Sequence, residues 1–105
     1  MDKRMNKRNF VREIRANLTA LGVGKGERME LNETVSTQKI TIGDRVINNE
    51  IRVKSVSNSG VFLEWYSNGV RQGYSGEYPY NNKNVDEMTA FNIARILSRR
   101  IQAIA

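Results

Sequence analysis

The chain has 105 residues, enough for one domain with its own core and too few for two. It contains no cysteine and no histidine, which excludes disulfides and thiolate metal sites and removes the usual general base. We therefore expect no cofactor, no metal site, no catalytic residue and no enzymatic activity. No apolar run is long enough to span a bilayer, so we expect no membrane partner and a cytoplasmic location.

The positive charge of the chain lies at its two ends. The formal net charge is +6: residues 1–15 hold six basic and two acidic side chains, residues 16–91 hold eight and nine, and residues 92–105 hold three and none. Basic ends around a near-neutral middle are typical of segments that contact an anionic partner such as nucleic acid. The alternative is that these charges only keep the surface solvated.

The first predicted element is a helix that starts at Asn6 or Asn9 and runs to Leu21, where Gly22 ends it. If it starts at Asn9, residues 1–8 form a flexible basic arm. The apolar stripe has helical spacing and should lie on a sheet: Phe10, Val11, Ile14, Leu18 and Leu21. The opposite stripe, expected to point into solvent, holds Arg8, Arg12, Arg15 and Thr19.

The segment Gly22 to Gly26 has glycines and a lysine, as phosphate-binding loops do, but a helix precedes it instead of following it. We therefore predict a helix end and a turn there. Apolar residues alternate with polar ones around Leu31 and again around Ile40, which predicts a strand on each side of a polar link. Asn48-Asn49 is either a tight turn or a bulge inside one long strand.

Residues 50–80 contain two turn signals between runs rich in β-branched and aromatic residues. They predict a three-stranded antiparallel meander. If the first turn, Asn58 to Gly60, is a three-residue loop with Gly60 in the left-handed conformation, the paired residues are Val53 with Trp65 and Lys54 with Glu64. If the second turn, Asn68-Gly69, is of type I′, the pairs are Ser67 with Val70, Tyr66 with Arg71 and Leu63 with Tyr74.

The two faces of this meander follow from the alternation of side chains along each strand. The core face is predicted to carry Ile51, Val53, Val61, Leu63, Trp65 and Tyr74. The outer face is predicted to carry Arg52, Lys54, Phe62, Glu64, Tyr66 and Arg71. We expect Trp65 to be buried beneath one or both helices.

A second helix is predicted after Pro79, which suits the end of an edge strand because proline has no amide hydrogen to donate. Asn84 and Glu87 resemble a capping box. The buried stripe consists of Ala90, Ile93, Ala94, Leu97, Ile101 and Ile104. The opposite stripe holds Arg95, Arg99 and Gln102, with Met88 and Phe91 flanking it and expected to be exposed.

The predicted fold is a single α+β domain over residues 1–105, an antiparallel meander of four or five strands with the N-terminal and C-terminal helices packed on one face. Carboxylates that could hold a catalytic metal are Asp44, Glu50, Glu64 and Glu77. Glu64 is more simply explained as the cross-strand partner of Lys54, and no acidic pair has nuclease-like spacing.

The sequence predicts a small regulatory or accessory protein that binds nucleic-acid phosphates, chiefly through its first helix. The candidate contacts are basic residues: Lys7, Arg8, Arg12, Arg15, Arg52, Lys54, Arg71, Arg95 and Arg99. On the outer face of the sheet, Phe62 and Tyr66 form a possible stacking platform between arginines. The alternative is a protein-binding module whose surface includes Tyr74, Tyr78 and Tyr80.

Overall fold

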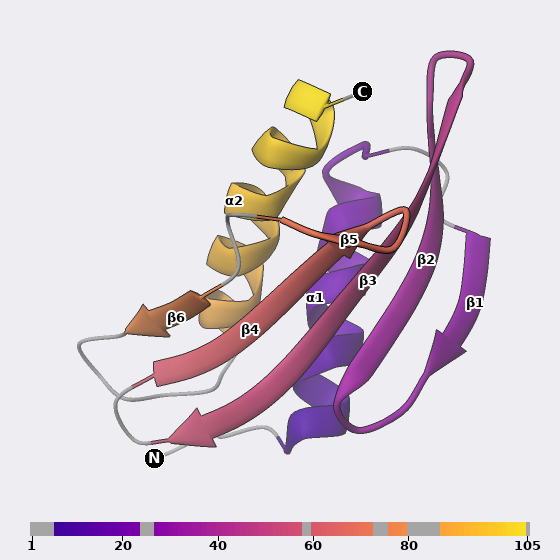
Figure 1. Ribbon diagram of the computed structural model, residues 1–105. Helices are drawn as coiled ribbons and strands as arrows, with labels where there is room; N and C mark the ends of the chain where they lie inside the picture. Colours follow the sequence, from indigo (N-terminus) through magenta and orange to yellow (C-terminus); the bar gives the residue numbers. More distant parts are fainter. Residues whose placement is uncertain (1–5, 24–26, 58–59, 73–75, 80–86, 105) are drawn as a thin grey trace.

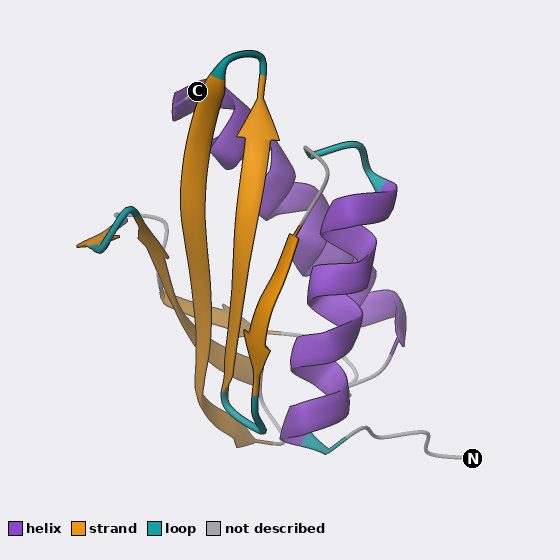
Figure 2. Cartoon of the chain, turned by 90° about the vertical axis from the view of Figure 1, so that its right-hand side faces the viewer, coloured by secondary structure: helices purple, strands orange, loops and turns teal. Residues whose placement is uncertain are grey.

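Two helices lie side by side on one face of an antiparallel sheet, and no helix of the described residues covers its other face (Figures 1 and 2). The computed structural model describes residues 6–23, 27–57, 60–72, 76–79 and 87–104. The elements in chain order are α1 (Lys7–Ala20), β1 (Glu27–Leu31), β2 (Val35–Ile42), β3 (Arg45–Ser57), β4 (Gly60–Ser67), β5 (Val70–Arg71), β6 (Gly76–Pro79) and α2 (Glu87–Ile104).

The sheet is a meander with the order β1-β2-β3-β4-β5, and β6 also pairs with β4. Every pair is antiparallel. Because β3 occupies one side of β4, the short strands β5 and β6 share its other side, at opposite ends. The predicted α+β fold, with both terminal helices on one face of an antiparallel meander, is therefore confirmed.

The predicted polar link between two strands is confirmed by β1 and β2. Asn48-Asn49 form neither the predicted turn nor the predicted bulge, although the one long strand of the second alternative is present. These two residues lie inside β3 and pair regularly with β2. The turn comes earlier, where Ile42 pairs with Arg45 around Gly43, whose φ is +63°. Glycine tolerates this left-handed conformation, which most residues avoid. Chain reversal at Gly43 therefore leaves β3 free to run for 13 residues.

The second predicted turn is confirmed. Asn68 and Gly69 have φ values of +52° and +82°, as a type I′ turn requires at both central positions. Ser67 accordingly pairs with Val70, and Tyr66 with Arg71.

The first predicted register, between β3 and β4, is wrong. Val53 does not pair with Trp65, and Lys54 does not pair with Glu64; instead Ile51 lies opposite Trp65. The further pairing of Leu63 with Tyr74 is also wrong, because Leu63 pairs with Gly76 of β6. Tyr74 itself lies outside the described residues.

Two one-residue shifts explain the error in the register between β3 and β4. Ser57 pairs with Gly60, so the loop between these strands has two residues and not three. A β-bulge between Val53 and Ser55 then adds one residue to β3. The total offset is two residues, and a shift of two keeps every side chain on its face. For the described residues, the predicted faces are consequently right although the pairs are wrong.

The core lies between the helices and the inner face of the sheet. Helix α1 buries Phe10, Val11, Ile14 and Leu18, as its spacing predicts. Helix α2 buries Ala90, Ile93, Ala94, Leu97 and Ile101. The sheet contributes the apolar residues Ile40, Ile47, Ile51, Val53, Val61, Leu63 and Trp65. Trp65 is only 1% exposed, which confirms that it is a core residue.

The ends of α1 follow from local hydrogen bonds. Asn6 caps the helix, since its side-chain Oδ1 accepts a hydrogen bond from the Asn9 amide at 2.8 Å. Lys7 is therefore the first helical residue, and Lys7 and Arg8 belong to the helix instead of to a flexible arm. At the other end Gly22 adopts a φ of +78°, the left-handed conformation that stops a helix. The predicted capping residue of α2, Asn84, lies outside the described residues.

Candidate functional site

A row of buried polar side chains crosses the inner face of the sheet. Gln38 of β2 lies opposite Asn49 of β3, which lies opposite Ser67 of β4, and their exposed fractions are 2%, 2% and 6%. The Trp65 indole Nε1 donates a hydrogen bond to Asn49 Oδ1. Gln38 Nε2 donates to Thr19 Oγ1 of α1 at 2.8 Å. These polar side chains therefore stabilise the alignment of the strands and connect α1 to β2. The alternation of residues along each strand did not predict this structural role.

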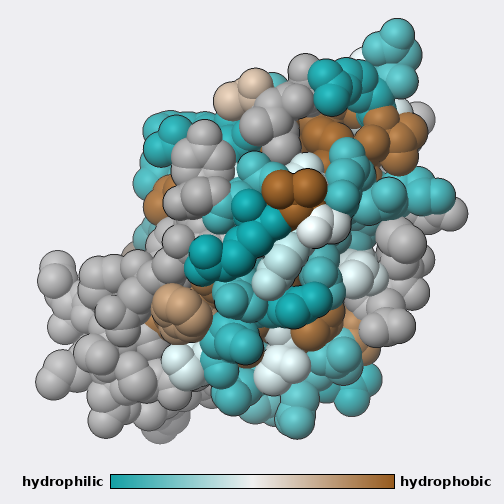
Figure 3. Space-filling view, in the orientation of Figure 1, coloured by the Kyte–Doolittle hydropathy of each residue, from teal (hydrophilic) through white to brown (hydrophobic). Residues whose placement is uncertain are grey.

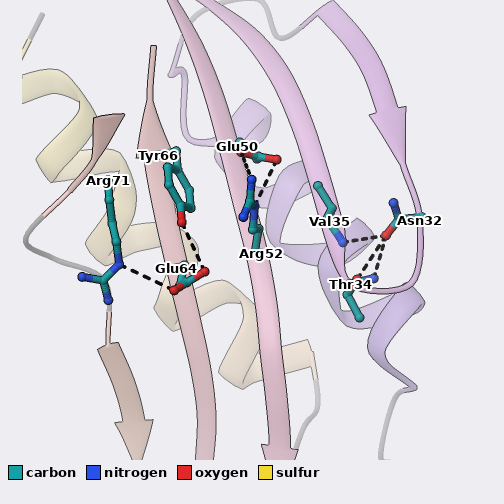
Figure 4. A network of polar contacts seen from close by, with 8 residues as sticks. All are labelled: Asn32, Thr34, Val35, Glu50, Arg52, Glu64, Tyr66 and Arg71. Atoms are coloured by element: carbon teal, nitrogen blue, oxygen red, sulfur yellow. Dashed lines mark hydrogen bonds and ion pairs between the residues drawn. The ribbon is translucent and has the colours of Figure 1, made fainter. Parts of the chain in front are cut away.

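Arg52, on the outer face of the sheet, is held by Glu50 two residues before it on β3 (Figure 4). Arg52 Nε lies 3.2 Å from Glu50 Oε2, and Arg52 Nη2 donates to Glu50 Oε1 at 3.3 Å. The hydrogen bond and the nearby negative charge of Glu50 raise the pKa of the Arg52 guanidinium. This arginine is already neutralised within the protein.

Arg71 forms an ion pair with Glu64. Its Nε lies 3.6 Å from Glu64 Oε2, and the Tyr66 hydroxyl donates to Glu64 Oε1 at 3.4 Å. The predicted pairing of Glu64 with Lys54 is therefore replaced by a contact across β4 and β5. Arg52 covers the Tyr66 ring, with its guanidinium carbon 4.4 Å from the ring centroid. We call Arg52 and Arg71 the sheet arginines.

Where it is coloured, the side of the molecule seen in Figure 3 is predominantly hydrophilic, with scattered apolar groups. Phe62 and Tyr66 are only partly exposed, and one side of the Tyr66 ring is occupied by Arg52. Lys54, the extra residue of the bulge, is exposed. Of the predicted platform, the structure brings Arg52, Tyr66, Glu64 and Arg71 together, and Glu50 completes the charge balance of this network.

The arginines of α1 divide into two kinds. Arg8 and Arg12 are exposed, whereas Arg15 is half-buried and its Nη1 atom is fully buried. The expectation that three arginines point into solvent together is therefore wrong for Arg15. The reason is that the end of this stripe that holds Arg15 and Thr19 lies close to the sheet, where Thr19 accepts a hydrogen bond from Gln38 of β2. Lys7 is also half-buried.

Helix α2 exposes three arginines, Arg95, Arg99 and Arg100, and the first two lie one turn apart on the side opposite its buried stripe. Met88 and Phe91, near the beginning of the same helix, are 73% and 42% exposed, as expected from their spacing.

Four exposed arginines share one property: within the described part of the chain, none of them forms an ion pair. They are Arg8, Arg12, Arg95 and Arg99, and we call them the helix-layer arginines. Each of them lies outside the buried stripe through which its helix packs on the sheet. The two helices form one layer on one face of the sheet (Figure 2).

No protein-family model, curated protein or solved structure matches this chain. The candidate site therefore depends on its geometry alone. Among the described residues, no group of three or more carboxylates is placed to hold a metal ion, and no helix is long and apolar enough to cross a membrane.

The structure does not describe the side chains of the three tyrosines of the alternative protein-binding surface. Tyr74 and Tyr80 lie outside the described residues. Tyr78 belongs to β6, where its backbone pairs with Val61, but its side chain lies outside the description.

Proposed function

We propose that this protein is a small non-enzymatic binding module that contacts nucleic-acid phosphates through the helix-layer arginines. The observation that carries the proposal is that Arg8, Arg12, Arg95 and Arg99 are exposed and have no carboxylate partner among the described residues. A cytoplasmic location, independence of cofactors and a regulatory or accessory role are parts of the same proposal.

Local spacing supports an anionic partner. Neither Arg95 nor Arg99 has an acidic residue three or four positions away, and the two arginines are themselves four positions apart. Like charges at this spacing destabilise a helix by a few tenths of a kcal/mol. Arg8 and Arg12 repeat the arrangement on α1. A polyanion that passes over both helices relieves this repulsion and meets guanidinium groups that suit bidentate phosphate contacts.

The sheet arginines are less suited to the same role. Arg52 and Arg71 each already contact a carboxylate, that of Glu50 or Glu64, and these carboxylates would repel an incoming phosphate. We therefore assign Arg52, Arg71 and the neighbouring Lys54 a secondary role, and Arg15 a role mainly in holding α1.

The test compares two double variants that remove the same charge from different places. Arg95→Gln with Arg99→Gln changes the helix layer, and Arg52→Gln with Arg71→Gln is the matched control on the sheet. Affinity for two unrelated duplexes is measured over a salt series. Each lost phosphate contact lowers the slope of log affinity against log salt by about 0.9, so the helix double should lower it by about 1.8. The sheet double should change it by less than about half of that.

The double variant Arg8→Gln with Arg12→Gln should also lower the slope of log affinity against log salt by about 1.8. The decrease should be the same on both duplexes, because phosphate contacts carry no sequence information. Urea unfolding of each variant checks that stability stays within about 0.5 kcal/mol of the original. Equal slopes for helix and sheet variants would contradict the assignment to the helix layer. If the unaltered protein binds no nucleic acid at low salt, the proposal fails and a protein-binding module becomes the first choice.

A further inference from the structure

The exposed side of α2 combines apolar and cationic groups in a fixed order. Met88, Phe91, Arg95 and Arg99 succeed one another at spacings of three, four and four residues, so they lie along one side of the helix. At a rise of 1.5 Å per residue, Phe91 is about 6 Å along the axis from Arg95, and Arg95 about 6 Å from Arg99. We call these four residues the α2 stripe.

Phe91 differs from the other aromatic residue near an arginine, Tyr66. The Tyr66 ring is covered by Arg52 and is only partly exposed. Phe91 is 42% exposed and, within the described residues, has no aromatic or cationic partner at its ring. The fold thus leaves one phenyl ring available beside two unpaired guanidinium groups.

We propose that the α2 stripe binds single-stranded nucleic acid, with an unstacked base against the Phe91 ring and flanking phosphates at Arg95 and Arg99. This inference rests on the proposed function and adds the class of nucleic acid. The charges of the stripe are all positive, which complements a phosphate backbone. In a duplex the base faces are stacked on one another, whereas a single strand offers faces that stack on aromatic side chains.

Met88 extends the same contact. It is 73% exposed and precedes Phe91 by three residues, so its side chain widens the apolar surface beside the ring. The α2 stripe is apolar at its N-terminal end and cationic at its C-terminal end. A bound strand would therefore place its base and its phosphates in a defined order along the helix. Ile96 provides an internal comparison, because it is 40% exposed but lies five residues from Phe91, about 140° around the helix.

The experiment measures binding of the full chain to three probes of equal length. The probes are oligodeoxythymidine, an oligomer with the same backbone and abasic sites in place of bases, and a duplex. One stacked base contributes a factor of about 5 to 150 in affinity, so oligodeoxythymidine should bind tighter than the abasic oligomer by that factor. Both should show a steep dependence on salt.

Three variants assign the preference to the ring. Phe91→Ala should bring oligodeoxythymidine to the affinity of the abasic oligomer while leaving duplex affinity and the salt slope unchanged. Phe91→Tyr keeps an aromatic face and should retain the preference. Ile96→Ala, which removes a similarly exposed apolar side chain from the same helix, should change nothing. Circular dichroism confirms that each variant is folded.

Two results would overturn this inference alone: equal affinity of the unaltered protein for oligodeoxythymidine and the abasic oligomer, or equal losses in Phe91→Ala and Ile96→Ala. The proposed function would survive both, because binding with a steep salt slope would persist. Displacement of the oligonucleotide by polyglutamate of the same charge, as efficiently as by oligodeoxythymidine, would also overturn it and indicate an acidic protein partner. No binding to any probe would instead remove the proposed function itself.

Discussion

The helix layer and the outer face of the sheet both display arginine, yet they treat its charge in opposite ways. On the sheet, Glu50 and Glu64 stand within 4 Å of Arg52 and Arg71 and neutralise them. On the helices, the exposed arginines have only neutral or basic neighbours one turn away. Antiparallel pairing brings residues far apart in sequence to the same place, whereas a helix surface depends on local spacing. Arginine content alone therefore does not identify a binding surface.

The largest expected effect on stability is at Trp65, and its neighbour Tyr66, on the opposite face of β4, provides the comparison. Trp65→Ala removes a fully buried side chain that packs beneath the helix layer, and should lower the free energy of unfolding by about 3 to 5 kcal/mol. Tyr66→Ala removes a half-exposed ring from the outer face and should lower it by about 1 kcal/mol. Urea unfolding measures both. Equal losses of unfolding free energy would contradict the burial of Trp65 on one face and the exposure of Tyr66 on the other.

The buried polar row provides a second comparison, again between neighbours on one strand. Asn49→Ala deletes the acceptor of the Trp65 indole hydrogen bond and should cost about 1 to 3 kcal/mol. Asn48→Ala changes an exposed side chain on the outer face and should cost less than about 0.5 kcal/mol. Thermal unfolding of the two variants is the measurement. If Asn48→Ala lowered stability as much as Asn49→Ala, the hydrogen bond between Asn49 and Trp65 would not explain the effect.

The smallest effect on stability is expected when the sheet arginines lose their carboxylate partners. This change also tests most directly whether ion pairing distinguishes the sheet from the helix layer. Glu50→Gln with Glu64→Gln keeps the shape of both side chains and removes their charge. Exposed ion pairs contribute little, so stability should fall by less than about 1 kcal/mol. Arg52 and Arg71 would then resemble the helix-layer arginines. If the protein binds nucleic acid, the duplex salt slope should rise by up to about 2.

The control for this change removes two negative charges elsewhere. Glu33 and Asp44 are exposed, and neither forms an ion pair with a sheet arginine. Glu33→Gln with Asp44→Asn should therefore leave the salt slope nearly unchanged. A similar increase in both double variants would mean that net charge, and not the pairing of particular arginines, controls binding.

The sequence by itself determined the two helices and the buried faces of β3 and β4. Apolar spacing in Phe10, Ile14 and Leu18 requires a helix with one buried side, and alternation along β3 and β4 requires one buried face of the sheet. The turn at Asn68-Gly69 also followed from local chemistry, because both residues tolerate a positive φ. These features depend on residues close together in the chain, so no knowledge of distant contacts was needed.

Only the tertiary structure decided the register between β3 and β4 and the state of each arginine. The bulge after Val53 has no local sequence signal, and it moved the partner of Trp65 to Ile51. The burial of Gln38 and Asn49 depends on being opposite one another beneath the helices. The candidate helix-layer arginines were predictable as an exposed stripe, but the partial burial of Arg15 and the neutralisation of Arg52 and Arg71 were not. Those outcomes depend on which carboxylates and helices the folded chain brings within a few ångströms, a property that sequence spacing does not contain.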